Sequence, residues 1–175
     1  MPARSPAQAA QEFSETLQLV VSTVTDGVLT IRNGYYPSPK PHALTFADSS
    51  TVRMHGDVRL ALSVDLRYRL VQNLSTSSRQ VWDIEIVSYM YAIRERNRAE
   101  IVSWHWHPGI PDIPSFPHLH LGPAAQVGRP EFHRAHLPTG IVTLADVVRS
   151  AITDFHVEPR RADWQAILDV VIDSP

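Results

Sequence analysis

The spacing of hydrophobic residues changes along the chain, from a helical period to a strand period and back. Near the N-terminus, five apolar residues recur every three or four positions: Phe13, Leu17, Val20, Val21 and Val24. Ser5 and Pro6 offer an N-cap and a first-turn proline before this stripe, and Asp26-Gly27 offers a stop after it. The pattern predicts a helix over residues 5–26 that packs against a core.

Apolar and polar positions then alternate, which is typical of half-buried strands. The alternating segments are residues 42–47, 51–54, 58–71, 81–93, 100–107 and 118–121. The first two flank the polar triplet at 48–50 and are predicted to form a hairpin. Residues 28–41 contain Asn33-Gly34 and three prolines, so we expect an irregular connection there.

Side-chain parity predicts which residues share a face of the sheet. In the strand over 81–93, one face takes Trp82, Ile84, Ile86 and Met90, and the other takes Asp83, Glu85, Tyr89 and Tyr91. In the strand over 100–107, one face takes Val102, Trp104 and Trp106, and the other takes Ile101, Ser103, His105 and His107. We therefore expect the tryptophans in the core and the histidines on a polar face, beside Tyr89, Tyr91 or an arginine row.

The helical period returns over residues 143–171. Thr143 and Asp146 have the spacing of a capping box, and Pro159 is expected to open a last helix. The order predicts an α+β fold in a single domain over residues 1–175. In it, an antiparallel sheet over 42–121 carries the N-terminal helix and two C-terminal helices on one face, and residues 1–4 form a loose terminus.

Composition narrows the function classes. The chain of 175 residues has 16 Lys plus Arg against 18 Asp plus Glu, so it lacks the basic excess typical of nucleic-acid binders. Because it has no cysteine, a metal could be bound only through His, Asp or Glu. No run approaches the roughly 18 apolar residues of a membrane helix, and the N-terminus lacks a signal-peptide core. We expect a soluble, cytoplasmic protein with no membrane partner.

The candidate chemistry is concentrated in residues 101–122, IVSWHWHPGIPDIPSFPHLHLG. Two His-x-His pairs, His105/His107 and His118/His120, flank a loop stiffened by four prolines. Residues two apart on a strand share a face, so each pair is expected to point one way. The pattern indicates a site but leaves its chemistry open.

Two kinds of chemistry are compatible with these histidines. A divalent metal such as zinc, nickel, iron or manganese can be held by His105, His107, His118 and His120, with Asp112 or Glu131 as a carboxylate. Alternatively, a neutral and a protonated imidazole can cleave RNA through its 2'-hydroxyl without a metal.

In the second case, the substrate contacts would come from other strands. Arg59, Arg67 or Arg69 would hold the phosphate, and Tyr89 or Tyr91 would stack on a base. A third interpretation is structural, with the imidazoles bonding loop carbonyls, and it is the better one for isolated histidines such as His133, His136 and His156.

Several of these motifs together resemble the TumE-like proteins of bacterial toxin–antitoxin systems. The resemblance rests on the Tyr-x-Tyr strand, WHWHP over 104–108, PSFPHLH over 114–120 and TLADVV over 143–148. It covers about residues 81–155 and is most specific at Phe116-Pro117-His118-x-His120. The family pattern has a similar Phe-Pro-His-His-Lys-His stretch and a Leu-x-Asp-Val helix. The resemblance implies a small cytoplasmic α+β toxin neutralised by an antitoxin protein.

The leading hypothesis is therefore a TumE-like toxin that acts on RNA as a ribonuclease-type enzyme. Its catalytic residues would be His118 and His120, with His105 and His107 beside them and no metal ligand assigned. Its substrate-binding residues would be Arg67, Arg69, Tyr89 and Tyr91. Two alternatives remain open: a non-catalytic binding or regulatory protein with a structural or metal-holding histidine cluster, and a His-ligated metal-dependent hydrolase.

Overall fold

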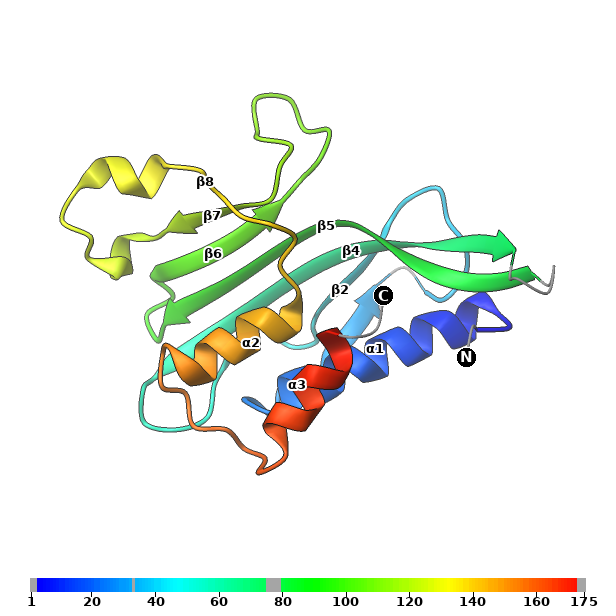
Figure 1. The fold of residues 1–175 in the computed structure, drawn as a ribbon, viewed down its shortest axis with the longest axis horizontal. Coiled ribbons are helices and arrows are strands. Elements are labelled where there is room, and N and C mark those ends of the chain that lie inside the picture. Colours follow the sequence, from blue (N-terminus) through cyan, green and yellow to red (C-terminus); the bar gives the residue numbers. More distant parts are fainter. Residues whose placement is uncertain (1–2, 33, 75–79, 173–175) are drawn as a thin grey trace.

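An antiparallel sheet forms one layer of the molecule and three helices form the other (Figure 1). The structure is a computed structural model that describes residues 3–32, 34–74 and 80–172. Its strands are β1 (Leu29–Arg32), β2 (His42–Phe46), β3 (Thr51–Arg53), β4 (Leu60–Leu74), β5 (Gln80–Glu95), β6 (Glu100–Trp106), β7 (His118–Leu121) and β8 (Leu137–Pro138). The helices are α1 (Pro6–Ser22), α2 (Leu144–Thr153) and α3 (Trp164–Ile172), with short 3-10 turns η1 (Pro123–Ala125) and η2 (Pro130–Arg134).

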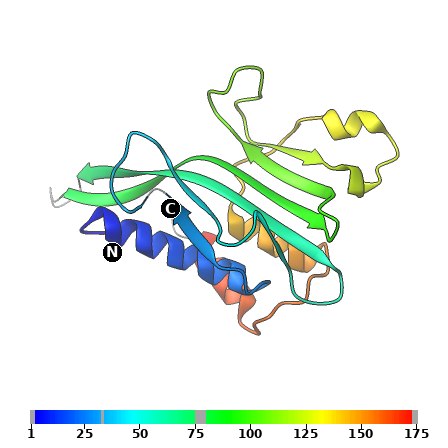
Figure 2. The same cartoon turned by 180° about the vertical axis from the view of Figure 1, so that it is seen from behind.

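The strand order is β1-β2-β4-β5-β6-β7-β8, with β3 paired to β4 beyond the end of β2. All three helices cover the same face of this sheet, as the view from behind also shows (Figure 2). The predicted α+β architecture is confirmed. In the described part of the chain, no helix has the length and apolar content that a membrane crossing requires.

The N-terminal helix follows its sequence signals at the start and departs from them at the end. The Ser5 hydroxyl accepts a hydrogen bond from the Gln8 amide at 3.1 Å, and Pro6 is the first helical residue. The helix ends at Ser22 instead of residue 26, although Val24 beyond it is still fully buried. Ala3 is not loose as expected, because its carbonyl accepts from the Trp82 amide at 2.9 Å and ties the segment to β5.

At the C-terminal end, one helix start is confirmed and one is wrong. The Thr143 side chain and the Asp146 backbone and carboxylate form the predicted capping box of α2. The last helix starts at Trp164 and not at Pro159. The reason is tertiary: the Arg160 amide donates to the Thr23 carbonyl at 2.7 Å, which holds the residues after Pro159 against the end of α1 in a non-helical path.

Two predictions about the first strands are wrong. Residues 28–41 are not wholly irregular, because all four residues of β1 pair with β2. The segments at 42–47 and 51–54 do not form a hairpin. Instead, β4 is long enough to pair with both, so Thr45 faces Asp65 and Thr51 faces Ser63. Pairing of this kind depends on a distant partner strand and leaves no local signal.

A β-bulge in β5 changes the side-chain parity that the sequence suggested. Tyr68 of β4 pairs with Ile86 and Arg67 pairs with Ser88, so Val87 is an extra residue without a partner. Before the bulge, even-numbered residues of β5 face the helices; after it, odd-numbered residues do. Tyr89 and Tyr91 are consequently buried in the core, and Met90 faces the other side, which corrects the expected grouping.

Candidate metal centre

The register between β6 and β7 places the histidines of these two strands side by side on the face of the sheet that the helices leave uncovered. His105 is directly opposite His118, and His120 is directly opposite Ser103. The neighbouring residues Trp104 and Leu119 point the other way and pack against the core. The predicted parity is thus confirmed over residues 102–106, with the tryptophans inside and His105 on the polar face. Ile101, which was expected on the histidine face, packs against the core instead.

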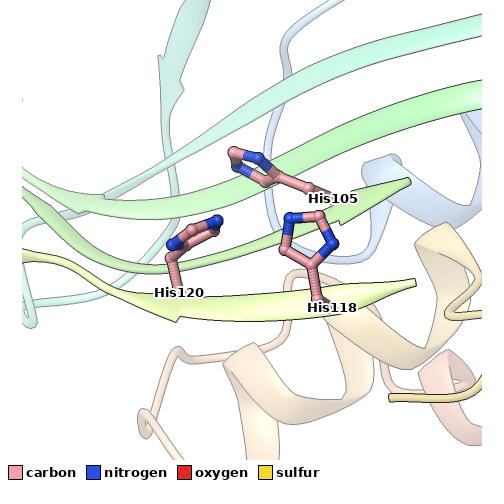
Figure 3. Close-up of side chains that lie close together, drawn as sticks. All are labelled: His105, His118 and His120. Atoms are coloured by element: carbon pink, nitrogen blue, oxygen red, sulfur yellow. The ribbon is translucent and has the colours of Figure 1, made fainter. Parts of the chain in front are cut away.

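Three of these imidazoles converge (Figure 3). His105, His118 and His120 each offer a ring nitrogen, and the three nitrogens lie within 4.8 Å of one another. The ring centroids of His105 and His120 are 4.9 Å apart, and those of His118 and His120 are 5.0 Å apart. Such spacing allows one small ligand to contact all three rings.

Two more imidazoles border the triad. His107 follows the end of β6, and its ring centroid is 5.5 Å from that of His105. His136 lies just before β8, with its centroid 4.5 Å from that of His120 and 4.9 Å from that of His118. The sequence indicated all of these except His136, which was expected to be an ordinary surface residue. Only the pairing of β7 with β8 reveals its position, and neither strand spacing nor a motif marks it.

The His118 ring is held in a defined orientation. Its Nδ1 lies 2.9 Å from the carbonyl oxygen of Phe116, and a carbonyl can only accept, so Nδ1 carries the proton. This leaves Nε2 with a free lone pair, which is the arrangement by which backbone groups orient metal-binding histidines. The side chain is also 1% exposed, so its rotamer is fixed by packing.

His105 has a ring nitrogen that makes no hydrogen bond to the described residues. Its Nε2 is buried and has no hydrogen-bond partner among the described residues. A buried nitrogen without a partner costs free energy unless a ligand or a water satisfies it. This atom is therefore one for which a bound ligand would supply the missing contact.

Burial and repulsion between imidazolium charges favour the neutral form of three of these histidines: His105, His107 and His120. Burial, followed by the positive charges that His120 and His107 would carry, lowers the pKa of His105 from 6.5 to about 4. Burial likewise lowers the pKa of His107 and of His120. Because only the neutral imidazole has a lone pair to donate, these shifts favour ligand binding near neutral pH.

A carboxylate network supports the cluster from one side. The Ser103 hydroxyl donates to Glu100 Oε1 at 2.6 Å, and Arg94 Nη2 donates to Glu100 Oε2 at 2.8 Å. A second bulge, at Ile101, brings Glu100 onto the same face as Ser103, because Arg94 pairs with Glu100 while Ile93 pairs with Val102. The Glu100 charge also acts on His120, where it partly opposes the lowering of the pKa by burial.

The arginines and tyrosines of the RNA hypothesis lie on opposite faces of the sheet. Arg67 and Arg69 are on the uncovered face, in a depression of about 450 Å³ that His107 also lines. Tyr89 and Tyr91 are 2% and 1% exposed, and their stacked rings, with centroids 4.9 Å apart, lie in the core. Stacking of a nucleobase on these tyrosines is thus ruled out, because the bulge at Val87 turns both inward.

The other residues considered for the site lie apart from it. Arg59 precedes β4 and lines neither depression on the uncovered face. Within the described ranges, the set with metal-ligand spacing consists of the three histidines alone and contains neither Asp112 nor Glu131. Asp112 is exposed in the proline-rich loop and Glu131 is exposed in η2.

Comparisons of the chain with protein-family models, with curated proteins and with solved structures give no match. The resemblance to TumE-like proteins is therefore a prediction that these comparisons do not test. What the chain can do must be argued from the site itself.

Proposed function

We propose that this protein is a metal-dependent hydrolase that binds a divalent transition metal through His105, His118 and His120. The observation that carries the proposal is the convergence of three imidazole nitrogens within 4.8 Å of one another. Neutral imidazole suits zinc, copper, iron and nickel, and the chain has no thiolate to compete.

The spacing fits such a metal after small side-chain movements. A metal bound at about 2.0–2.1 Å by three imidazoles needs ring nitrogens roughly 3.3 Å apart in a tetrahedral arrangement. The nitrogens lie within 4.8 Å of one another, so on metal binding the His105 and His120 rings would have to rotate toward the His118 ring, moving their nitrogens by up to about 1.5 Å. Both rings come from paired strands, so the backbone need not move.

Three protein ligands would leave a coordination position open to solvent, which distinguishes catalytic zinc sites from closed structural ones. A metal with such a position acidifies a bound water molecule and makes it a nucleophile at neutral pH. His107 and His136 border the triad on two sides. Either is placed to exchange a proton beside the metal or to supply a fourth ligand.

The lowered pKa values of His105 and His120 suit metal binding by these two residues. Cleavage of RNA by two histidines needs one imidazolium as the acid. Burial lowers the pKa of His105 to about 4 and also lowers the pKa of His120, so these residues offer bases near neutral pH and no acid. The metal proposal uses the neutral rings of His105 and His120 as they are.

The test is metal binding by the untagged protein. After chelation and dialysis, the wild type is titrated with Co²⁺ and Zn²⁺, and the Co²⁺ absorption spectrum reports the coordination geometry. We expect the wild type to bind one equivalent of metal. The variants His105→Ala and His120→Ala should each bind it at least tenfold more weakly, because each has lost one ligand. His55→Ala is the matched control, because His55 is exposed and outside the cluster. Equal affinity in all four proteins would refute the proposal.

The TumE-like toxin hypothesis remains a separate proposal, supported by the sequence motifs alone. It is tested by growth and total-RNA integrity in a bacterial host after induced expression of the wild type. The comparison is a His118→Ala/His120→Ala variant verified to be equally soluble. Arrest with loss of RNA in the wild type only would support a toxin that acts on RNA, and normal growth with intact RNA in both would discard an autonomous toxin in that host.

A further inference from the structure

The uncovered face of the sheet is hollowed beside the histidines. One depression of about 520 Å³ and a second of about 450 Å³ share Asp65, Arg67 and Met90 in their walls. The two depressions together form one hollow. The floor of the first depression includes Ala43 of β2 and Ser63 of β4, whose short side chains leave space above the strands. Volumes in this range are typical of sites for small molecules.

A cross-strand row connects this hollow to the candidate metal centre. Thr45, Asp65, Met90, His105 and His118 are successive partners across β2, β4, β5, β6 and β7. Arg67 lies two residues after Asp65 on β4 and two strands away from His105. With the usual strand spacings, its Cα is about 12 Å from that of His105. A molecule of modest size can therefore contact both.

The charge of the hollow is mainly positive. Arg32 and Arg67 flank Ala43 in register, since Arg32 pairs with Ala43 and Ala43 pairs with Arg67. Two strand spacings separate the two arginines by about 10 Å at Cα, and only a methyl group lies between them. Their long side chains can thus converge on one anion above Ala43.

These guanidinium groups have donors to spare. Arg67 Nε is 3.4 Å from an Asp65 oxygen, a contact that orients the group and leaves its Nη atoms free. Arg32 forms no ion pair within the described part of the chain and is exposed. Arginine pairs of this kind match the geometry of phosphate oxygens, each donating two hydrogen bonds.

We propose that the hollow binds a small phosphate-bearing molecule, with its phosphate on Arg32 and Arg67 and its other end at the histidine triad. The inference rests on the proposed function, since it names the substrate class of that same metal site. The phosphate would anchor the molecule, and the bond to be hydrolysed would lie toward His105.

The composition of the walls favours a small molecule over a nucleic-acid strand. Proteins that bind single strands stack bases on exposed aromatic rings. Phe46 is the one Phe, Tyr or Trp residue in the walls of the two depressions, and it is 1% exposed and packed in the core. The chain also carries a net charge of −2, which weakens the long-range attraction on which nucleic-acid binding depends.

The experiment measures binding of inorganic phosphate and phenyl phosphate to the chelated, metal-free protein by calorimetry. Working without metal separates this inference from the metal proposal, which has its own titration. We expect Arg32→Gln/Arg67→Gln to weaken phenyl phosphate binding about tenfold or more, as expected for lost charge-assisted hydrogen bonds. The matched control is Arg160→Gln, since Arg160 is exposed in the segment that contacts α1 on the helical side of the sheet.

Three results would overturn the inference. The first is equal binding of phenyl phosphate by the wild type and the double variant, and the second is no binding by either at millimolar ligand. The third is tighter binding of a short single-stranded RNA than of phenyl phosphate, with affinity that rises as the RNA is lengthened, which would assign the hollow to nucleic acid. Metal binding without phosphate binding would overturn this inference and leave the metal proposal intact.

Discussion

His105 and His118 face each other across β6 and β7, with ring centroids 5.6 Å apart. The residues beside them, Trp104 and Leu119, form the next cross-strand pair and point into the core. Strand parity therefore builds the histidine cluster and part of the core from the same two strands. Because both strands are tied into the sheet, changes that loosen their pairing should affect stability and the cluster together.

The histidine cluster should make the metal-free protein less stable in acid. In the unfolded chain, a histidine has a pKa near 6.5, whereas burial and neighbouring imidazoles lower the pKa of folded His105 to about 4. Between these pH values the unfolded state binds more protons than the folded state, so the free energy of unfolding rises with pH. The contribution of His105 to that free energy is lost as the pH falls from about 6.5 toward 4. Urea unfolding of chelated protein at successive pH values measures this slope.

A variant isolates the contribution of that residue to the slope. His105→Gln should flatten the pH dependence between about pH 6.5 and 4, because it removes a group whose proton uptake differs between the two states. His55→Ala, outside the cluster, should keep the wild-type slope. An unchanged slope in His105→Gln would mean that His105 takes up protons equally in both states.

Two buried tyrosines should differ in how loss of the hydroxyl group changes the stability of the fold. The Tyr89 hydroxyl accepts a hydrogen bond from the Val142 amide at 3.0 Å and so joins β5 to the segment before α2. Tyr89→Phe leaves that amide without its partner and should lower the free energy of unfolding by about 1–2 kcal/mol.

Tyr68 is the matched case, since its hydroxyl is buried without a partner among the described residues. Tyr68→Phe should leave stability unchanged or raise it by up to about 1 kcal/mol. Urea unfolding of the two variants beside the wild type measures both effects. A loss in Tyr68→Phe as large as that in Tyr89→Phe would contradict the assignment and point to a water molecule that bonds the Tyr68 hydroxyl.

The sequence predicted the features that depend on local signals. The capping box at Thr143 and Asp146, the N-cap at Ser5 and the alternation over β4 and β6 each need only neighbouring residues. The shared face of His118 and His120 likewise follows from their spacing along one strand. The helices on one side of an antiparallel sheet then follow from the order of these elements.

The features that sequence analysis missed depend on distant partners. His136 joins the cluster only because β8 pairs with β7, and β1 exists only because β2 is beside it. The burial of Tyr89 and Tyr91 depends on one extra residue at Val87, and no residue type there announces a bulge. Register between strands is a property of the whole sheet, which local alternation does not determine.

Gly122 should be required for the approach of β7 to β6. A Cβ atom at this position would overlap the carbonyl oxygen of Glu100, while the Gly122 amide donates to the Ile101 carbonyl at 2.8 Å. Gly122→Ala should cost about 1–3 kcal/mol, in the range of overpacking, and weaken Co²⁺ binding because β7 carries His118 and His120. Gly140→Ala is the control, since no heavy atom lies within 4 Å of the added Cβ, and it should bind Co²⁺ normally. Equal stability of the two variants in urea would argue against the close approach.

The bulge at Val87 should be essential to the fold. Deleting Val87 forces β5 into one continuous parity, so either Tyr89 and Tyr91 leave the core or Ile84 and Ile86 do. Each choice exposes large apolar side chains, and the expected loss exceeds about 4 kcal/mol, enough to unfold many domains. Val87→Ala keeps the extra residue and should cost less than about 1.5 kcal/mol, because the side chain is only half-buried. Circular dichroism melting curves separate these outcomes, and a deletion variant as stable as Val87→Ala would show that β5 can pair without the bulge.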